Sequence, residues 1–274
     1  MARDKYNKEF HPKEYDPDFP RLQCIKCGYM NSCKCESSRM VPRYPRLPIL
    51  MMGGMVESVV HDDGSEINIS PITQHALKSI RDSEFISYPT KRLKIENIIQ
   101  EDLLLKIKET WPIRSDMREE PIGRFQINNF NFNKYYQQLY DDVIDNVYVK
   151  CAIVDKLVEE VELGNPNISL WEDTNNFSVN DVHIDYGSFY ITLGIFLPDD
   201  DSTIEYGTEF WDPYKFSDDR DETFTKQECD LIERLPFKQN TGYVMVSDRK
   251  SYHASPDINK DIIRKHIYVS YPKI

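Results

Sequence analysis

The sequence has no apolar run long enough to cross a membrane, and its first twenty residues are mostly polar or charged. A membrane span needs about 18 or more consecutive apolar residues, and a secretory signal needs an apolar stretch near the N-terminus. Neither is present, so we expect a protein without membrane contact that stays in the cytoplasm.

Basic residues are scarce relative to acidic ones, at 34 Lys and Arg against 46 Asp and Glu, for a formal net charge of −12. The shortage begins after residue 50, because residues 1–50 carry ten basic and six acidic side chains. An acidic body repels nucleic-acid phosphates, so we do not expect a DNA or RNA partner. The 40% hydrophobic residues are enough for a core and exclude a wholly disordered chain.

The first 50 residues contain six prolines and show no helical or strand periodicity. We interpret them as an extended arm, a segment suited to docking on a protein partner or an assembly. Residues 51–92 are expected to form a hairpin and a linker, with the hairpin over 55–70 turning at Asp62-Asp63-Gly64. Apolar spacing near 3.6 predicts helices over 95–110 and, twice, within 133–162.

From residue 168 onward the pattern changes to short β-type runs separated by Asp, Asn, Pro and Gly clusters. These runs are ISLW, SVNDVHI, SFYITLGIFL, GTEFW, GYVMVS and HIYVSY. Many short strands preceded by helices predict a mostly-β fold, a jelly roll with helices packed on one of its sheets.

A metal site is predicted from His183-Ile184-Asp185 and the later His253. Two imidazoles and one carboxylate form the 2-His-1-carboxylate set that holds Fe(II) and leaves coordination positions open. Residues two apart on a strand point to the same face, so we expect His183 and Asp185 to share one strand. A second His-x-Asp, at His61 and Asp63, precedes Gly64 and is explained by the hairpin turn.

Two histidines compete for the third ligand position. Strand parity over 262–271 places Arg264, His266 and Tyr268 on one face, so His266 is the rival of His253. We prefer His253, because that choice leaves Arg264 free for a ligand carboxylate, to which a guanidinium donates two parallel hydrogen bonds.

Residues 182–198 (VHIDYGSFYITLGIFLP) resemble the metal-binding strand–loop–strand of Fe(II)/2-oxoglutarate-dependent oxygenases, most closely the prolyl-hydroxylase-like group of phages and bacteria. The resemblance covers about residues 93–271, and Val182 departs from it where a proline commonly precedes the histidine. The motifs that carry it further are Phe196-Leu197-Pro198, Gly207-Thr208, Pro236-Phe237 with Asn240, and Ser251-Tyr252-His253.

The resemblance implies a double-stranded β-helix whose iron ligands are His183, Asp185 and His253. It implies that Arg264 pairs with the distal carboxylate of 2-oxoglutarate and that Thr192 or Tyr190 donates a second hydrogen bond to it. The implied activity consumes O2 and 2-oxoglutarate and hydroxylates an unidentified substrate, a protein side chain or a small molecule.

Four of the six cysteines lie within 12 residues, as Cys24, Cys27, Cys33 and Cys35. Four thiolates complete a tetrahedral Zn2+ site, so we predict a structural zinc knuckle in the arm. Disulfides and unliganded thiols are the alternatives, and a reducing cytoplasm disfavours disulfides.

Two other functions fit the same residues. One is a structural or assembly protein built on the oxygenase barrel with little catalysis, located in a virion if a phage encodes it. The other is a metal-binding barrel of the cupin type that does not use 2-oxoglutarate.

Overall fold

The computed structural model describes most of the chain from residue 66 onward and three short strands before it. The described residues are 22–24, 40–42, 58–60, 66–120, 123–128, 133–158, 161–174, 177, 181–185, 189–215, 223–258 and 262–274. The chain divides into two compact units, one of residues 1–53 and 59–67 and one of residues 54–58 and 68–274. The second unit therefore includes residues 68–92, which the sequence analysis assigned to a hairpin and a linker.

Short strands interrupt the N-terminal segment. Strand β1 (Leu22–Cys24) pairs antiparallel with β2 (Met40–Pro42), a pairing that the expectation of an extended arm missed. The predicted hairpin over 55–70 is confirmed by the pairing of β3 (Ser58–Val60) with β4 (Glu66–Asn68). The turn with His61 and Asp63 lies outside the described residues, as do three of the four clustered cysteines, so the zinc site stays a prediction.

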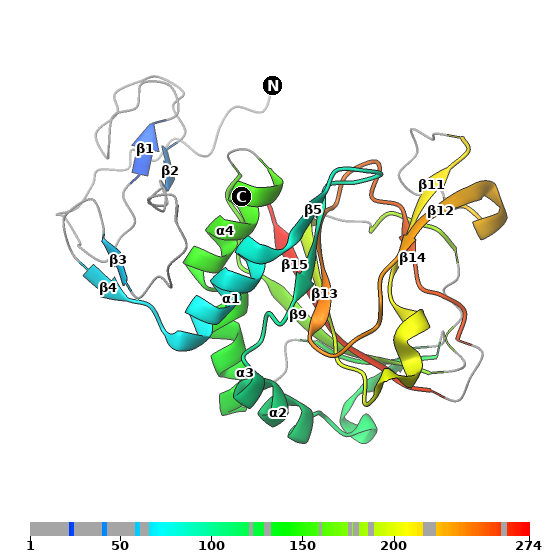
Figure 1. Ribbon diagram of the computed structural model, residues 1–274, viewed down its shortest axis with the longest axis horizontal. Helices are drawn as coiled ribbons and strands as arrows, with labels where there is room; N and C mark the ends of the chain where they lie inside the picture. The colour runs from blue at the N-terminus through cyan, green and yellow to red at the C-terminus, as the bar shows by residue number, and fades with distance from the viewer. Residues whose placement is uncertain are drawn as a thin grey trace, which may run out of the picture. The chain divides into compact units, whose positions relative to one another are not determined.

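The second unit is built on an eight-stranded antiparallel sheet in the order β5-β6-β13-β10-β15-β9-β8-β7 (Figure 1). Its strands are β5 (Glu84–Ile86), β6 (Arg92–Glu96), β7 (Arg118–Glu120), β8 (Arg124–Asn128), β9 (Asn167–Asp173), β10 (Phe189–Phe196), β13 (Thr241–Val246) and β15 (Arg264–Pro272). The runs expected at 168–171, 188–197, 242–247 and 266–271 form the four central strands of this sheet.

A second sheet contains β12 (Cys229–Arg234), β11 (Glu209–Pro213) and β14 (His253–Ala254), in that order. Isolated bridges add Val182 and His183 to it, opposite Phe224 and His253 respectively. The two sheets make the predicted jelly roll. A salt bridge from Arg92 of β6 to Glu233 of β12, 2.7 Å between Nη2 and Oε2, joins the two sheets.

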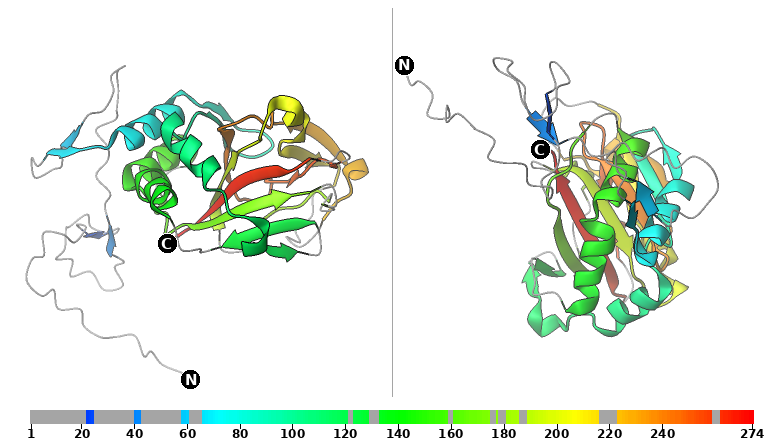
Figure 2. Two further views of the ribbon diagram at one scale, coloured as in Figure 1. Left: turned by 90° about the horizontal axis from the view of Figure 1, so that it is seen from below. Right: turned by 90° about the vertical axis from the view of Figure 1, so that its left-hand side faces the viewer.

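The outer face of the large sheet is apolar. Alternate residues of β10 on this face, Ile191, Leu193 and Ile195, are aliphatic and fully buried. Helices cover this face (Figure 2), and Tyr271 on the same face donates a hydrogen bond to the Ile144 carbonyl, 3.0 Å away. The helices are α1 (Pro71–Asp82), α2 (Glu101–Glu109), α3 (Lys134–Leu139), which continues as the π-helix η2 (Tyr140–Ile144), and α4 (Val147–Leu157). Short 3-10 turns are η1 (Arg114–Asp116), η3 (Asp201–Tyr206) and η4 (Lys226–Glu228).

The helices differ in part from the predicted ones. The helix expected over 95–110 begins only at Glu101, because residues 92–96 pair with β13 as a strand. Helix α1 was not predicted, although Ser70 caps it by accepting a hydrogen bond from the Thr73 amide at 3.1 Å and Pro71 occupies its first turn. No described helix is long and apolar enough to span a membrane.

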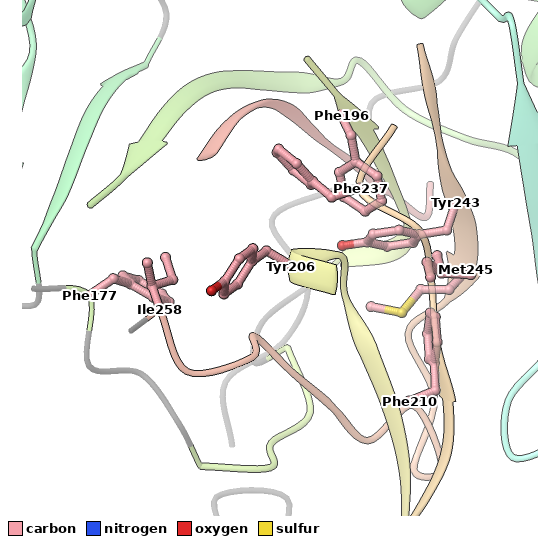
Figure 3. Packing of buried hydrophobic residues seen from close by; sticks show 9 residues of the cluster. Phe177, Phe196, Tyr206, Phe210, Phe237, Tyr243, Met245 and Ile258 are labelled. Atoms are coloured by element: carbon pink, nitrogen blue, oxygen red, sulfur yellow. The ribbon is translucent and has the colours of Figure 1, made fainter. Parts of the chain in front are cut away.

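The inner face of the large sheet carries aromatic and polar side chains instead of aliphatic ones. Figure 3 shows Phe210, Met245 and Tyr243 in a column on one side of the interior and Phe177 with Ile258 on the other. Gly194 of β10 makes room for this packing, because a Cβ there would lie 2.6 Å from the Tyr243 ring. Burying each such side chain contributes roughly 1.5–3 kcal/mol to the stability of the fold.

Candidate metal centre

Three potential metal ligands meet where the HxD segment runs beside β14. One ligand atom from each of His183, Asp185 and His253 lies within 4.8 Å of the others. Among the described residues this is the one such cluster of His, Cys, Asp and Glu, and it does not include His266. The expectation of one regular strand for His183 and Asp185 was wrong, since only Val182 and His183 form bridges and Asp185 follows in an irregular segment.

The two histidines are held by their own backbones. His183 and His253 exchange both backbone hydrogen bonds, at 3.0 and 2.9 Å. The preceding residue, Val182, makes the same exchange with Phe224 at 2.8 and 2.9 Å. Because directly opposed residues of an antiparallel pair project to the same side, the two imidazoles lie together, with ring centroids 4.7 Å apart.

Hydrogen bonds to carbonyl groups orient both imidazoles. The Nδ1 atom of His183 lies 2.9 Å from the Asp181 carbonyl oxygen, and that of His253 lies 2.8 Å from the Ser251 carbonyl oxygen. A carbonyl only accepts, so each Nδ1 carries the proton and each Nε2 has a free lone pair. These Nε2 atoms lie 3.9 and 3.5 Å from Oδ1 of Asp185, near the roughly 3 Å that separates adjacent ligands of an octahedral ion with bonds of about 2.1 Å.

Hydrogen bonds to Oδ2 orient the carboxylate of Asp185. The Tyr268 hydroxyl donates to Oδ2 at 2.8 Å, and the Thr192 hydroxyl lies 3.5 Å from the same atom and 3.2 Å from Ser247 Oγ. Oδ1 is thereby turned toward the two imidazoles. Tyr268 was placed on the correct face by strand parity, but the sequence contained no sign of its partner.

The charges suit a divalent cation. Burial opposes ionisation of Asp185, but His253, His183 and Tyr268 hold the pKa of its carboxyl well below the usual range. Burial and the neighbouring His253 lower the pKa of His183, so this imidazole is neutral at pH 7. Burial also opposes protonation of His253, yet Asp185 raises the pKa of that imidazole, so metal binding at Nε2 would compete with its protonation.

A buried charged cluster occupies the other end of the same inner face. Asp173 accepts from Arg124, at 2.6 Å from Nε and 3.1 Å from Nη2, and from Arg264 Nη1 at 3.1 Å. Asp173 and Arg264 are almost completely buried. Two guanidinium groups and one carboxylate leave an excess of one positive charge, and Arg264 Nε has no hydrogen-bond partner among the described residues.

An aromatic stack connects this cluster to the candidate metal ligands. The Trp171 ring lies 3.8 Å from the Arg124 guanidinium carbon and stacks on Tyr268, with centroids 4.2 Å apart and planes 13° apart. Neither Arg124 nor Asp173 was predicted from the sequence as part of the site. Arg124 and Arg264 are both directly opposite Asp173. This arrangement depends on the pairing of β8 and β15 with β9.

The two expected partners of Arg264 lie elsewhere. Thr192 is opposite Ser270 in the β10–β15 ladder, six residues and therefore about 20 Å along the strand from Arg264. Tyr190 lies still nearer the end of β15, where its ring contacts Lys273 Nζ at 5.3 Å. Neither hydroxyl can share one carboxylate with Arg264, which corrects the expectation for both.

Comparison with solved structures yields matches at low sequence identity. Prolyl 4-hydroxylase from Phytophthora capsici matches with a TM-score of 0.50 and 10% identity, over 74% of this chain and 64% of that chain. Prolyl-4-hydroxylase from Pseudomonas putida matches with a TM-score of 0.47 and 11% identity, over 73% and 99%. An oxidoreductase of the 2OG-Fe(II) oxygenase family from Burkholderia pseudomallei matches with a TM-score of 0.43 and 12% identity, over 75% and 91%.

No protein-family model matches the sequence, and no curated protein matches it significantly. The chain has the jelly-roll fold of the 2-oxoglutarate oxygenases, which confirms the fold class predicted from the sequence.

Proposed function

We propose that this chain, which has the fold of the prolyl-hydroxylase-like 2-oxoglutarate oxygenases, is an Fe(II)- and 2-oxoglutarate-dependent dioxygenase. We further propose that it hydroxylates a protein side chain or a small molecule. The observation that carries the proposal is the convergence of two imidazole Nε2 atoms and one carboxylate oxygen on one point. A buried, partly unpaired guanidinium on the same inner face supports the choice of cosubstrate.

The donor set fits a ferrous ion. Each imidazole has its proton on Nδ1, and Asp185 is ionised, so all three ligand atoms have free lone pairs. Two imidazoles and one carboxylate on one side of an ion leave the opposite positions open, which is the arrangement of non-heme Fe(II) oxygenases. The Tyr268 hydroxyl occupies Oδ2 of Asp185 and so favours binding through Oδ1 alone.

The excess positive charge beside Asp173 fits a dicarboxylate cosubstrate. An uncompensated buried cation is costly, and a ligand carboxylate at Arg264 Nε would remove both the excess charge and the unpaired donor. Arg264 then orients the far end of 2-oxoglutarate while the near end faces His183, Asp185 and His253.

When bound, iron together with 2-oxoglutarate would supply the chemistry by which O2 oxidises a C–H bond to C–OH, while 2-oxoglutarate is oxidised to succinate and CO2. The chain's own residues hold the ligand geometry and exclude water. Phe196 and Tyr243 belong to the aromatic cluster of the interior, whose low polarity strengthens each electrostatic contact and limits side reactions (Figure 3).

The test is anaerobic titration of the purified full chain with Fe(II) and 2-oxoglutarate, followed by O2 and measurement of succinate. We expect a visible charge-transfer band on mixing and succinate formation after O2 is admitted. The variants His183→Ala and His253→Ala should lose both signals. The matched control is His75→Ala on α1, outside the site, which should retain both.

Two other outcomes would favour the alternatives. Binding of metal and 2-oxoglutarate without succinate would support a non-catalytic barrel, including the assembly role. Metal binding with no effect of Arg264→Met on 2-oxoglutarate affinity would support a cupin-type metal protein.

A further inference from the structure

His266 is a buried histidine with an unpaired ring nitrogen. It lies on the inner face of β15 between Arg264 and Tyr268, is 7% exposed, and its Nδ1 has no hydrogen-bond partner among the described residues. Leaving such a group unpaired costs about 1–3 kcal/mol, so a native structure that keeps one calls for an explanation. His266 was the rival of His253 as third metal ligand, but it does not belong to the cluster of His183, Asp185 and His253.

The position of His266 along β15 indicates which ligand group could accept a hydrogen bond from its Nδ1. Alternate residues of β15 face the interior about 6.6–6.8 Å apart, with Arg264 at the cosubstrate end and Tyr268 beside the metal ligand Asp185. A dicarboxylate that reaches from the metal to Arg264 must therefore pass His266. Cross-strand neighbours enclose this position, because Trp171 of β9 and Phe196 of β10 are both opposite His266.

The charge state of His266 suits donation to an anion. Burial, together with Arg264 and Arg124, lowers the pKa of His266 to about 3, although Asp173 opposes the shift. The imidazole is therefore neutral at physiological pH. With its proton on Nδ1, it donates one hydrogen bond without adding to the excess charge.

We propose that His266 is a cosubstrate-binding residue that donates its Nδ1–H to the distal carboxylate of 2-oxoglutarate held by Arg264. This inference rests on the proposed function. His266 would then be the second hydrogen-bond donor to the distal carboxylate, in place of Thr192 or Tyr190. Both of those residues lie at the other end of the β10–β15 ladder.

The test compares two variants of the full chain loaded with Mn(II), so that binding is measured without turnover. His266→Phe removes the donor and keeps a planar ring. His266→Asn keeps an N–H donor near the place of Nδ1. We expect calorimetry to show that 2-oxoglutarate binds the Phe variant on the order of 10- to 100-fold more weakly than wild type, and the Asn variant within about fivefold of wild type.

A ligand control separates hydrogen bonding from a merely structural effect. 2-Oxopentanoate has the carbon chain of 2-oxoglutarate but lacks the distal carboxylate, so its affinity should not differ between wild type and His266→Phe. Equal weakening of both ligands, or no weakening of 2-oxoglutarate, would overturn the role of His266. Failure of the Mn(II)-loaded wild type to bind 2-oxoglutarate would instead overturn the proposed function.

A second measurement avoids substitution of the site. In Zn(II)-loaded wild type labelled with 15N-histidine, the Nδ1 signal of His266, identified by its absence in His266→Asn, should shift with 2-oxoglutarate and not with 2-oxopentanoate. An unchanged signal at saturating 2-oxoglutarate would contradict the proposal even if the Phe variant does not fold.

Discussion

His183 and His253 are direct cross-strand partners, each donating its backbone N–H to the other's carbonyl oxygen, at 3.0 and 2.9 Å. Their side chains must then project to the same side, and their Nδ1 bonds to carbonyl groups turn both Nε2 atoms toward Asp185. The candidate metal site is therefore organised by backbone pairing without an ion. This reduces the conformational entropy that metal binding would otherwise cost.

The Tyr268 hydroxyl should control metal affinity through Asp185. Tyr268→Phe removes the hydrogen bond to Oδ2 and frees the carboxylate to rotate, so we expect metal affinity to fall by about 10- to 100-fold. Mn(II) titration followed by electron paramagnetic resonance measures this. The control is Tyr271→Phe on the outer face, whose hydroxyl bonds the Ile144 carbonyl, and which should leave metal affinity unchanged. Equal affinities for Tyr268→Phe and wild type would contradict the assignment.

Asp173 should be essential to stability, because it is the shared carboxylate of Arg124 and Arg264. Asp173→Asn leaves the buried guanidinium of Arg264 and the partly buried one of Arg124 without an anion. It should lower the free energy of unfolding, measured by urea denaturation, by about 3–5 kcal/mol. The control, Asp199→Asn, removes an exposed pair with Lys265 and should cost less than about 1 kcal/mol. Similar losses of stability for the two variants would contradict the conclusion that Asp173 neutralises buried positive charge.

His266 should make the metal-free protein less stable as pH falls from about 6.5 to about 3. Its folded pKa of about 3 lies below the unfolded value, so only the unfolded chain takes up the proton in this window. The groups that face it are Asp173, Arg264 and Arg124. Relative to His266→Asn, wild type should lose about 2 kcal/mol of unfolding free energy between pH 7 and pH 5. Parallel pH profiles of the two proteins would disprove a neutral buried imidazole.

A side chain at position 194 should clash with the ring of Tyr243 and lower stability. A Cβ at Gly194 would lie 2.6 Å from Cε1 and 2.8 Å from Cζ of Tyr243, so Gly194→Ala should destabilise the fold by about 1–3 kcal/mol. The clash disappears in Gly194→Ala/Tyr243→Leu, so the alanine should cost much less in a Tyr243→Leu background. A double-mutant cycle of thermal unfolding measures this coupling, and additive effects would contradict it.

Much of the architecture was predictable from local patterns. Strands β9, β10, β13 and β15 were recognisable from short apolar runs between turn residues, and α4 from helical spacing. Helix α1 was missed although its signals, Ser70 followed by Pro71 and apolar residues at Ile72, Ala76 and Ile80, are present in the sequence. Residues 92–96 were ambiguous, because a short apolar run fits a helix or a strand until its pairing with β13 is known.

The sequence by itself determined the chemistry of the candidate site: two histidines, an aspartate and an arginine in an order that resembles an oxygenase. Residue types and their order carry this information, because ligand preference belongs to the side chain. Only the tertiary structure decided which histidine joins the metal cluster, which tyrosine orients Asp185, and that Arg124 and Arg264 share Asp173. Those choices depend on cross-strand register, which is set by how whole strands pair and pack and is not visible in local periodicity.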